Sequence, residues 1–344
     1  MMMRCNSGGV GGVEGKVDLA KKNSFLESLV AIGEGFQEIF AGFGSAIGDV
    51  FGFNLVKVGD KKSKVGEHFK EIGDGLTTTN NKLKELEGKI LEAKNADGVT
   101  IEAVKGAIKG ANDVFTRLIT SLTKLADVTN DGSDIGDTVN NAAVAANVDD
   151  VKTIIENVKV VIELADKSGV KIRKGYEGEK VDAAGDANTA PAVLTHNAGA
   201  ASGGSKLAEE VVKADPWAMI DKIKNSTTNI AVLAGNDKDA GTLATGGAVA
   251  NGAGAKSNAD LVAAVALKAM TKGGKFSANA DAVTVKSAAA SAVNKVLRIL
   301  DVIMRKTVSN NLEKVSEAIK GIKYSETSGS EASQSDATQP VVTK

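Results

Sequence analysis

The sequence predicts an all-α fold: an elongated bundle of several helices with a long C-terminal helix, loops rich in glycine, alanine and asparagine, and a disordered C-terminal tail. Composition is the first reason. Only 3% aromatic residues and three prolines in 344 residues disfavour a β-sandwich and favour helices packed through small side chains. The second reason is a stretch at residues 258–276 that is apolar around almost its whole circumference. The third is an uninterrupted helical repeat over residues 280–323.

The stretch at residues 258–276 has the pattern of a buried helix. We expect Asn258 to cap its first turn and Gly273 to follow its last turn. After Asn258, the only polar residues up to position 271 are Asp260, Lys268 and Thr271, so apolar side chains point in almost every direction. A helix of this kind must be buried nearly all round. We therefore expect it to be the central rod of the bundle.

Residues 280–323 form the longest periodic run in the chain, and no proline interrupts it. Apolar residues recur in steps of three to five, close to the helical repeat, and charged residues occupy the opposite face. About forty residues at ~1.5 Å each make a helix of roughly 60 Å, longer than a compact globule of this size needs. The bundle should therefore be elongated.

Residues 24–53 carry apolar side chains at helical spacing, and Ser24 with Glu27 forms a capping box at the start of this segment. Several glycines interrupt the pattern, and each weakens a helix by up to ~1 kcal/mol relative to alanine. We expect either that close packing against a neighbour offsets this cost or that the helix breaks there. The glycines are Gly33, Gly35, Gly42, Gly44 and Gly48.

Three further segments, at residues 61–87, 100–128 and 149–168, are predicted to be amphipathic helices that face the core. Regular patterning then fades in two zones, residues 171–208 and 235–256, which are rich in small and polar residues. Both zones resemble surface loops. We expect them to bury little and to tolerate changes of sequence at little cost in stability.

These patterns divide the chain into three parts. Residues 1–22 are rich in glycine and are predicted to be a flexible tether. Residues 23–324 are predicted to form a single helical bundle domain. Residues 325–344 have almost nothing apolar to bury and are predicted to be disordered.

Charge and cysteine content exclude several classes of protein. Lysine plus arginine is 42 against 43 aspartate plus glutamate, with the signs interspersed, so we expect no nucleic-acid partner. A single cysteine, Cys5, excludes an internal disulfide framework and a cysteine-based metal cluster. No run of eighteen apolar residues is present, so no membrane-spanning helix is predicted. The sequence does not indicate an oligomeric state.

The sequence contains no recognisable catalytic motif. It has two histidines and lacks the HExxH, CxxC, GxSxG and nucleotide-binding fingerprints, so we predict neither an enzyme nor a cofactor. His68 is expected to be half exposed on a helix surface rather than a ligand or base, and His196 is assigned no role. The only tryptophan, Trp217, follows Pro216 and is expected to pack into the bundle rather than bind a ligand.

Two clusters of basic residues leave an alternative open. They could contact a sulfated glycan or an anionic surface, but acidic residues flank both, and solvated helix ends explain them better. A surface adhesin that binds host glycosaminoglycan or matrix is thus the second functional hypothesis. The clusters are Lys61, Lys62, Lys64 and Lys171, Arg173, Lys174.

Cys5 is the one residue that indicates a covalent modification. A cysteine near the N-terminus, followed by Asn-Ser-Gly-Gly and a polar tether, is what signal cleavage leaves in a bacterial lipoprotein, and several acyl chains there would hold the protein on a membrane. The alternative is an exposed free thiol without a role. The residues before Cys5, MMMR, supply no apolar leader, so we expect the chain as written to be neither exported nor lipidated.

Several blocks of sequence resemble one known family. They are CNSGGV, GEGFQEIFAGFGSAIGDVFGF, DKKSKVGEHF, ADPWAMIDKI, VAAVALKAMTKGGKFS and SAAASAVNKVLRILDVIMRKTV. Together they are similar to the variable large proteins, which belong to the variable major proteins of relapsing-fever Borrelia, and to the related variable surface lipoprotein of Lyme spirochaetes. The resemblance covers nearly the whole chain from residue 5 to about residue 323.

The resemblance implies a function. Proteins of this family are helical, elongated lipoproteins of the bacterial outer surface, with both chain ends near the membrane and variable loops at the far end. One gene is expressed at a time, and switching changes the exposed epitopes, so that host antibodies miss the next variant. The acylated cysteine of the family corresponds to Cys5. The missing leader would fit an archived gene copy, or a start codon placed too late.

Overall fold

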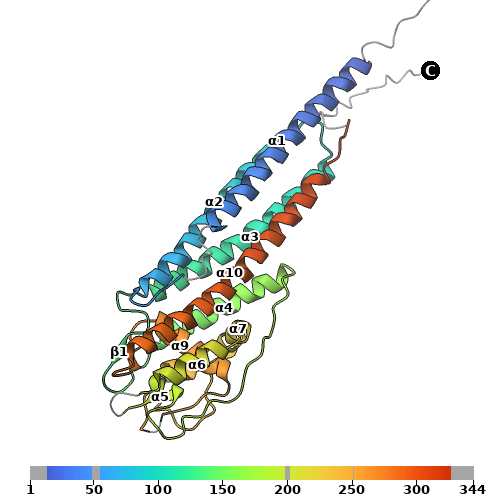
Figure 1. The fold of residues 1–344 in the computed structure, drawn as a ribbon. Helices are drawn as coiled ribbons and strands as arrows, with labels where there is room; N and C mark the ends of the chain where they lie inside the picture. The colour runs from blue at the N-terminus through green and yellow to red at the C-terminus, as the bar shows by residue number, and fades with distance from the viewer. Residues whose placement is uncertain (1–13, 49–54, 198–201, 251, 327–344) are drawn as a thin grey trace, which may run out of the picture.

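The computed structural model describes residues 14–48, 55–197, 202–250 and 252–326. It confirms the predicted elongated all-α bundle with a long C-terminal helix (Figure 1). Two very short strands, β1 and β2, pair in parallel with Thr138 opposite Phe276. The elements run in the order α1 (Glu14–Gly48), α2 (Ser63–Leu91), α3 (Gly98–Thr129), β1 (Thr138–Val139), α4 (Val148–Lys167), α5 (Ala190–Thr195), α6 (Gly204–Lys213), α7 (Pro216–Asn225), α8 (Ala240–Thr245), α9 (Asn258–Met270), β2 (Phe276–Ser277) and α10 (Ala282–Lys320).

One half of the rod is a shaft made of α1, α2, α3 and the second half of α10 (Figure 1). Helices α2 and α3 pack along each other, and α10 packs on α3. Helix α1 packs on α2 through one buried face, with Phe25, Ile32 and Ile39 spaced seven residues apart. At ~1.5 Å per residue, the 39 residues of α10 run for about 58 Å. A single helix therefore runs through both halves of the molecule.

Helix α9 lies at the centre of the other half, in contact with α7, α8 and α10, and all of its residues are buried. This confirms the prediction of a central rod. The predicted cap was wrong by one residue. Ser257 is the N-cap, and its hydroxyl accepts a hydrogen bond from the backbone N–H of Asp260 at 3.1 Å. The side chain of Asn258 instead donates to the carbonyl oxygen of Glu210 at 3.0 Å, tying α9 to α6.

The two zones expected to be loops of little burial contain helices. Helices α5 and α6 begin inside the first zone, and α8 lies inside the second. Every residue of α5 and of α8 is buried, so the prediction that these zones bury little was wrong there. Six-residue helices are too short to show a helical period in the sequence. Their burial comes from the elements that pack around them.

The start of α1 also differs from the prediction. The helix begins at Glu14, so residues 14–22, expected to belong to a flexible tether, form its first turns. Ser24, expected to cap the helix, lies inside it. The glycines do not break the helix. A Cβ at Gly35 would lie 3.2 Å from Leu86 on α2, which fits close packing, whereas Gly33 faces open space.

The first and last parts of the described chain meet at one end of the rod, as Figure 1 shows. The hydroxyl of Tyr324 donates to the carboxylate of Asp18 at 3.2 Å, and its ring packs on Phe25 with centroids 5.6 Å apart. The N–H of Asp97, in the turn between α2 and α3, donates to the carbonyl of Lys323 at 2.8 Å. We call the start of α1, the α2–α3 turn and the end of α10 the chain-end face.

Candidate functional site

Two largely exposed segments lead over the end opposite the chain-end face: residues 171–189, which run to that end from the end of α4, and residues 227–239. We call these segments the loop end. Large side chains point to solvent there, among them Tyr176, Ile230 and Val232. The first segment lies inside the first predicted loop zone, whereas residues 227–234 of the second segment lie outside both zones. Both segments lie over the buried helices α5, α8 and α9, at the lower left of Figure 1.

Two buried threonines fix the backbone beneath the loop end. The hydroxyl of Thr195, at the end of α5, accepts a hydrogen bond from the N–H of Ala253 at 2.9 Å. The hydroxyl of Thr245, at the end of α8, accepts from the N–H of Asn229 at 3.0 Å. Each threonine thus ties a distant stretch of chain to the end of a short helix. A fixed backbone can present different exposed side chains in the same positions.

Side chains within the loop end hold its shape as well. The carboxylate of Asp239 accepts from the N–H of Thr242, which caps α8, and from the hydroxyl of Thr227 at 3.0 Å. The side-chain oxygen of Asn236 accepts from the N–H groups of Ala183 and Gly254, both at 3.1 Å. These contacts hold the two exposed segments in place.

Two buried lysines hold the turns around α9. The Nζ of Lys268 lies 2.7 Å from the carbonyl oxygen of Leu194 in the last turn of α5 and over the ring of Phe276. Burial, together with the nearby charge of Lys62, lowers the pKa of Lys268 to about 7. The Nζ of Lys62 donates to the carbonyl oxygen of Thr271, just after α9, at 2.7 Å. Both ammonium groups therefore meet carbonyls at helix ends, where the helix dipole favours a cation.

The prediction for His68 was wrong. This side chain is 5% exposed, and its Nε2 lies 2.9 Å from a carboxylate oxygen of Asp301 on α10. Burial raises the pKa of Asp301, and the hydrogen bond with His68 opposes that rise. The spacing held a signal that we missed, because His68 stands three residues after Val65 and four before Ile72, on the same buried face of α2.

The other residues singled out from the sequence have structural positions. His196 is buried next to the end of α5, and its carbonyl accepts a hydrogen bond from the N–H of Ala143 at 2.9 Å. Trp217 packs partly buried against the core, in agreement with the prediction, and the guanidinium of Arg173 lies 5.9 Å from its ring centroid. Cys5 and the tail from residue 327 lie outside the described residues, so the lipidation of Cys5 and the disorder of the tail stay predictions.

The first basic cluster is not a continuous cationic surface. Lys62 is buried, the Nζ of Lys61 lies 2.6 Å from Asp134, and Lys64 pairs with Glu67 at 3.3 Å. The second cluster, at Lys171, Arg173 and Lys174, is exposed within the loop end.

Two further kinds of feature are absent from the described residues. Across residues 14–48, 55–197, 202–250 and 252–326, no group of three or more histidine, cysteine, aspartate or glutamate side chains could hold a metal ion. None of the helices in these ranges combines the length and the apolar character needed to span a bilayer.

Comparison with known proteins gives consistent results. The family model described as Borrelia lipoprotein matches residues 36–319. Variable large protein 14 of Borrelia hermsii is 59% identical over 332 residues, covering 94% of this chain and 92% of the relative. Variable large protein 12 of the same organism is 55% identical over 335 residues, covering 96% and 92%. The crystal structure of the Lyme disease variable surface antigen VlsE of Borrelia burgdorferi matches with a TM-score of 0.69 at 26% identity, covering 86% of this chain and 99% of that chain.

Proposed function

Because this chain belongs to the Borrelia lipoprotein family, we propose that it is an antigenically variable lipoprotein of the bacterial outer surface, anchored to the membrane through acyl chains on Cys5. Its relatives are named variable large proteins, and a structurally similar protein is named a variable surface antigen. In this proposal one such gene is expressed at a time. Replacing it changes the surface that host antibodies bind, and the protein needs no catalytic activity for that role.

The observation that carries the proposal is the separation of the two ends of the rod. The described chain starts and finishes at the chain-end face, and α10 runs for about 58 Å toward the loop end. A tether that leads from Glu14 to a lipid on Cys5 would place the chain-end face at the membrane. The loop end would then be the part of the molecule that an antibody meets first.

The packing supports different roles for the exposed residues of the loop end and for the buried helices beneath them. Exposed positions such as Ile230 and Val232 can change with small effects on stability, because surface substitutions usually alter it by less than about 0.5 kcal/mol. The buried helices α5, α8 and α9 fix the backbone on which those side chains stand. Antigenic change would therefore be concentrated in residues 171–189 and 227–239 rather than spread over the whole of the predicted loop zones.

The direct test is protease treatment of intact Borrelia cells that express the chain behind a lipoprotein leader, so that cleavage leaves Cys5 first. We expect the protease to remove the protein without lysis, and mass spectrometry to find a triacylated peptide at Cys5. The matched Cys5→Ser variant should lose the acyl mass and its retention by the membrane. A protein that stays protected from protease and unmodified at Cys5 would contradict the proposal.

Glycan binding remains a second candidate because the three cations at Lys171, Arg173 and Lys174 are exposed. None of them forms an ion pair with a carboxylate within the described part of the chain. If they bind a sulfated glycan, the full chain should elute from heparin above physiological salt, and a variant with all three changed to glutamine should elute earlier. The variant Lys61→Gln/Lys64→Gln is the matched control. Elution of the unaltered chain below physiological salt would exclude this candidate.

A further inference from the structure

Helix α1 presents an apolar stripe to solvent on the face that does not pack on α2. Leu26, Val30 and Phe40 are 56%, 59% and 46% exposed, and Leu19 extends the stripe toward the chain-end face. Its positions follow one another in steps of four and three residues, which is the spacing of a helix seam that packs against another helix. The complete stripe is Leu19, Asn23, Leu26, Val30, Gly33, Gln37, Phe40 and Gly44.

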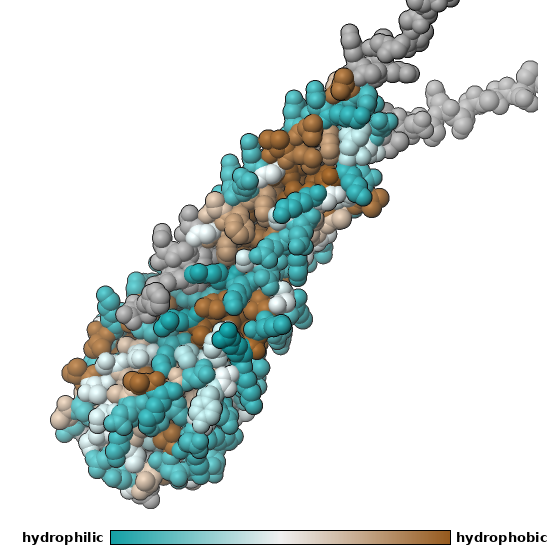
Figure 2. Space-filling view, turned by 45° about the vertical axis from the view of Figure 1, so that its right-hand side comes forward, coloured by the Kyte–Doolittle hydropathy of each residue, from teal (hydrophilic) through white to brown (hydrophobic). Residues whose placement is uncertain are grey.

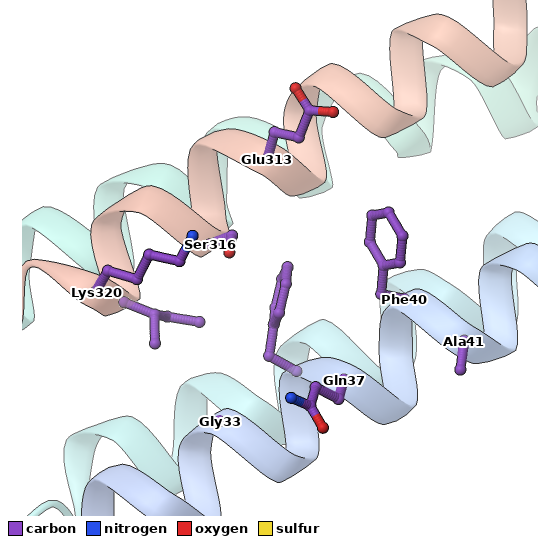
Figure 3. Close-up of a pocket in the computed structure, with 9 residues that line it drawn as sticks. Gly33, Gln37, Phe40, Ala41, Glu313, Ser316 and Lys320 are labelled. Atoms are coloured by element: carbon purple, nitrogen blue, oxygen red, sulfur yellow. The ribbon is translucent and has the colours of Figure 1, made fainter.

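The stripe leads into a groove between α1 and α10, because α1 packs extensively on α2 and only slightly on α10. The groove has a volume of about 520 Å³ and is mostly apolar. Figure 3 shows Phe40 reaching into the gap from α1, with Ser316 and Lys320 on the facing side of α10. Figure 2 shows apolar surface exposed along this half of the rod. Phe36 and Ile319 complete the apolar lining.

Charged side chains of opposite sign border this surface. On the α10 side, Glu313 also lines the groove. Glu27 and Glu34 stand beside the stripe on α1, and Lys320 stands on the α10 side of the groove. Within the described residues none of the three forms an ion pair, although other exposed charges near the chain-end face do, such as Lys22 with Asp18 at 2.6 Å. The surface therefore offers acidic and basic groups to a partner.

We propose that this groove is the contact surface between two copies of the chain, related by a two-fold axis parallel to the rod. Such an axis leaves the position of every residue along the rod unchanged. It places α1 of each copy against α10 of the other. Gly33 and Lys320 line the same groove, so they lie at similar positions along the rod. Glu34, next to Gly33, would therefore lie opposite the partner's Lys320. Glu34 of one copy then meets Lys320 of the other, twice in each dimer.

The shape of the surface favours a helix as its occupant. From Leu19 to Gly44 the stripe runs for about 25 residues, or roughly 38 Å, which is far longer than a small molecule. A second copy supplies two helices of the required length and complementary charge. The alignment of two copies side by side on a membrane rests on the proposed anchor at Cys5, and anchoring would raise their effective concentration. The pairing of the grooves does not depend on that anchor.

Cross-linking tests the contact directly, with the full chain in solution and Cys5→Ser as background. One copy carries Glu34→Cys, a differently tagged copy carries Lys320→Cys, and a short bis-maleimide is added to the mixture. We expect a cross-linked product that contains both tags. The control pairs Lys320→Cys with Val212→Cys, which is 78% exposed on α6 and far from the groove, and should give no such product.

Sedimentation of the same Cys5→Ser chain provides the second readout. We expect a species of twice 35.2 kDa that dissociates on dilution. The variant Lys320→Glu should raise the dissociation constant about tenfold or more, because like charges then face each other, and adding Glu34→Lys should reverse that effect. The variant Val212→Glu should change nothing.

A chain that sediments as a monomer at every concentration and gives no cross-link between Glu34→Cys and Lys320→Cys would overturn the proposal. A dimer that Lys320→Glu leaves intact would overturn it as well. Neither result bears on lipidation or surface display, because both measurements use soluble protein. Conversely, a dimer observed in solution would support the proposed contact even if protease treatment of cells contradicted the surface location.

Discussion

The imidazole of His68 on α2 and the carboxylate of Asp301 on α10 meet at 2.9 Å inside the shaft. Both side chains are buried, and burial raises the pKa of Asp301. The pair joins the second helix of the bundle to the last through a polar contact in an apolar core. A polar pair of this kind fixes which positions of the two helices stand opposite each other, because a shift along either axis would leave both groups buried without a partner.

Removing one member of this pair should therefore be costly. We expect His68→Leu to lower the free energy of unfolding by about 2–5 kcal/mol, because it leaves the carboxyl of Asp301 buried without that partner. The double variant His68→Leu/Asp301→Leu should recover much of the loss. Urea unfolding of both variants measures this, with Asp74→Ala, which breaks an exposed pair with Lys70, as the control. Additive losses in the double variant would mean that the two residues are not coupled.

Lys268 should make stability depend on pH. In the folded chain its pKa is about 7, whereas the ordinary value is 10.5. Between these pH values the folded chain binds fewer protons than the unfolded chain, so the contribution of Lys268 to stability rises as pH increases. We expect the wild-type protein to gain stability relative to Lys268→Met from pH 7 to about pH 10. Urea unfolding across this range checks it, and the exposed Lys152→Met should show no such trend.

Replacing either of two glycines with alanine should change the stability of the protein, but in opposite directions. A Cβ at Gly241, in α8, would collide with the carbonyl oxygen of Thr227 and lie 3.1 Å from Ile155. A Cβ at Gly106, in α3, would meet nothing within 4 Å. We expect Gly241→Ala to destabilise the protein by about 1–3 kcal/mol and Gly106→Ala to stabilise it by up to about 1 kcal/mol. Thermal unfolding of the two variants gives the comparison, and equal effects would refute the packing described for α8.

The stability effects of changing one buried and one exposed apolar residue test whether the loop end tolerates substitution while the helices beneath it do not. Leu243 is fully buried in α8, so Leu243→Ala should cost about 2–5 kcal/mol. Ile230 is 76% exposed in the loop end, so Ile230→Ala should change stability by less than about 0.5 kcal/mol. Urea unfolding measures both. A large loss on changing Ile230 would mean that the loop end does not tolerate the variation that we propose.

The long helices could be predicted from the sequence because their burial repeats with the helical period. For α10 the expected segment, residues 280–323, contains the observed helix and exceeds it by only a few residues at each end. The complete burial of α9 followed from its lack of a polar face. Such patterns are local, and the rest of the fold need not be known to read them.

The short helices could not be predicted in this way. Helices α5 and α8 have six residues each, and their alanine, glycine and threonine content also fits a loop. What buries them is distant in sequence, as in the contact of Thr195 with Ala253 or of Lys268 with Leu194. The contacts of the two buried lysines could not be predicted for the same reason. Nothing in the sequence near Lys62 indicates that the carbonyl of Thr271, far along the chain, takes its ammonium group.

Of the proposed functional residues, Cys5 was identified from its local context and lies outside the described part of the chain. The exposed segments of the loop end were only partly predicted. Residues 171–189 lie in the first expected loop zone, but residues 227–234 lie outside both zones. Exposure there is set by which short helices form beneath the loops, and this depends on the tertiary fold.

The course of α1 along α2 also determines how the rod would bear a mechanical load. A pull applied between residue 14 and the loop end acts along the axis of α1. Helix α1 can then separate only by sliding along α2, which strains their whole interface at once, whereas a sideways pull would peel the contacts apart turn by turn. The molecule should therefore resist extension best along its length, the direction in which a load would act if the rod were held at one end.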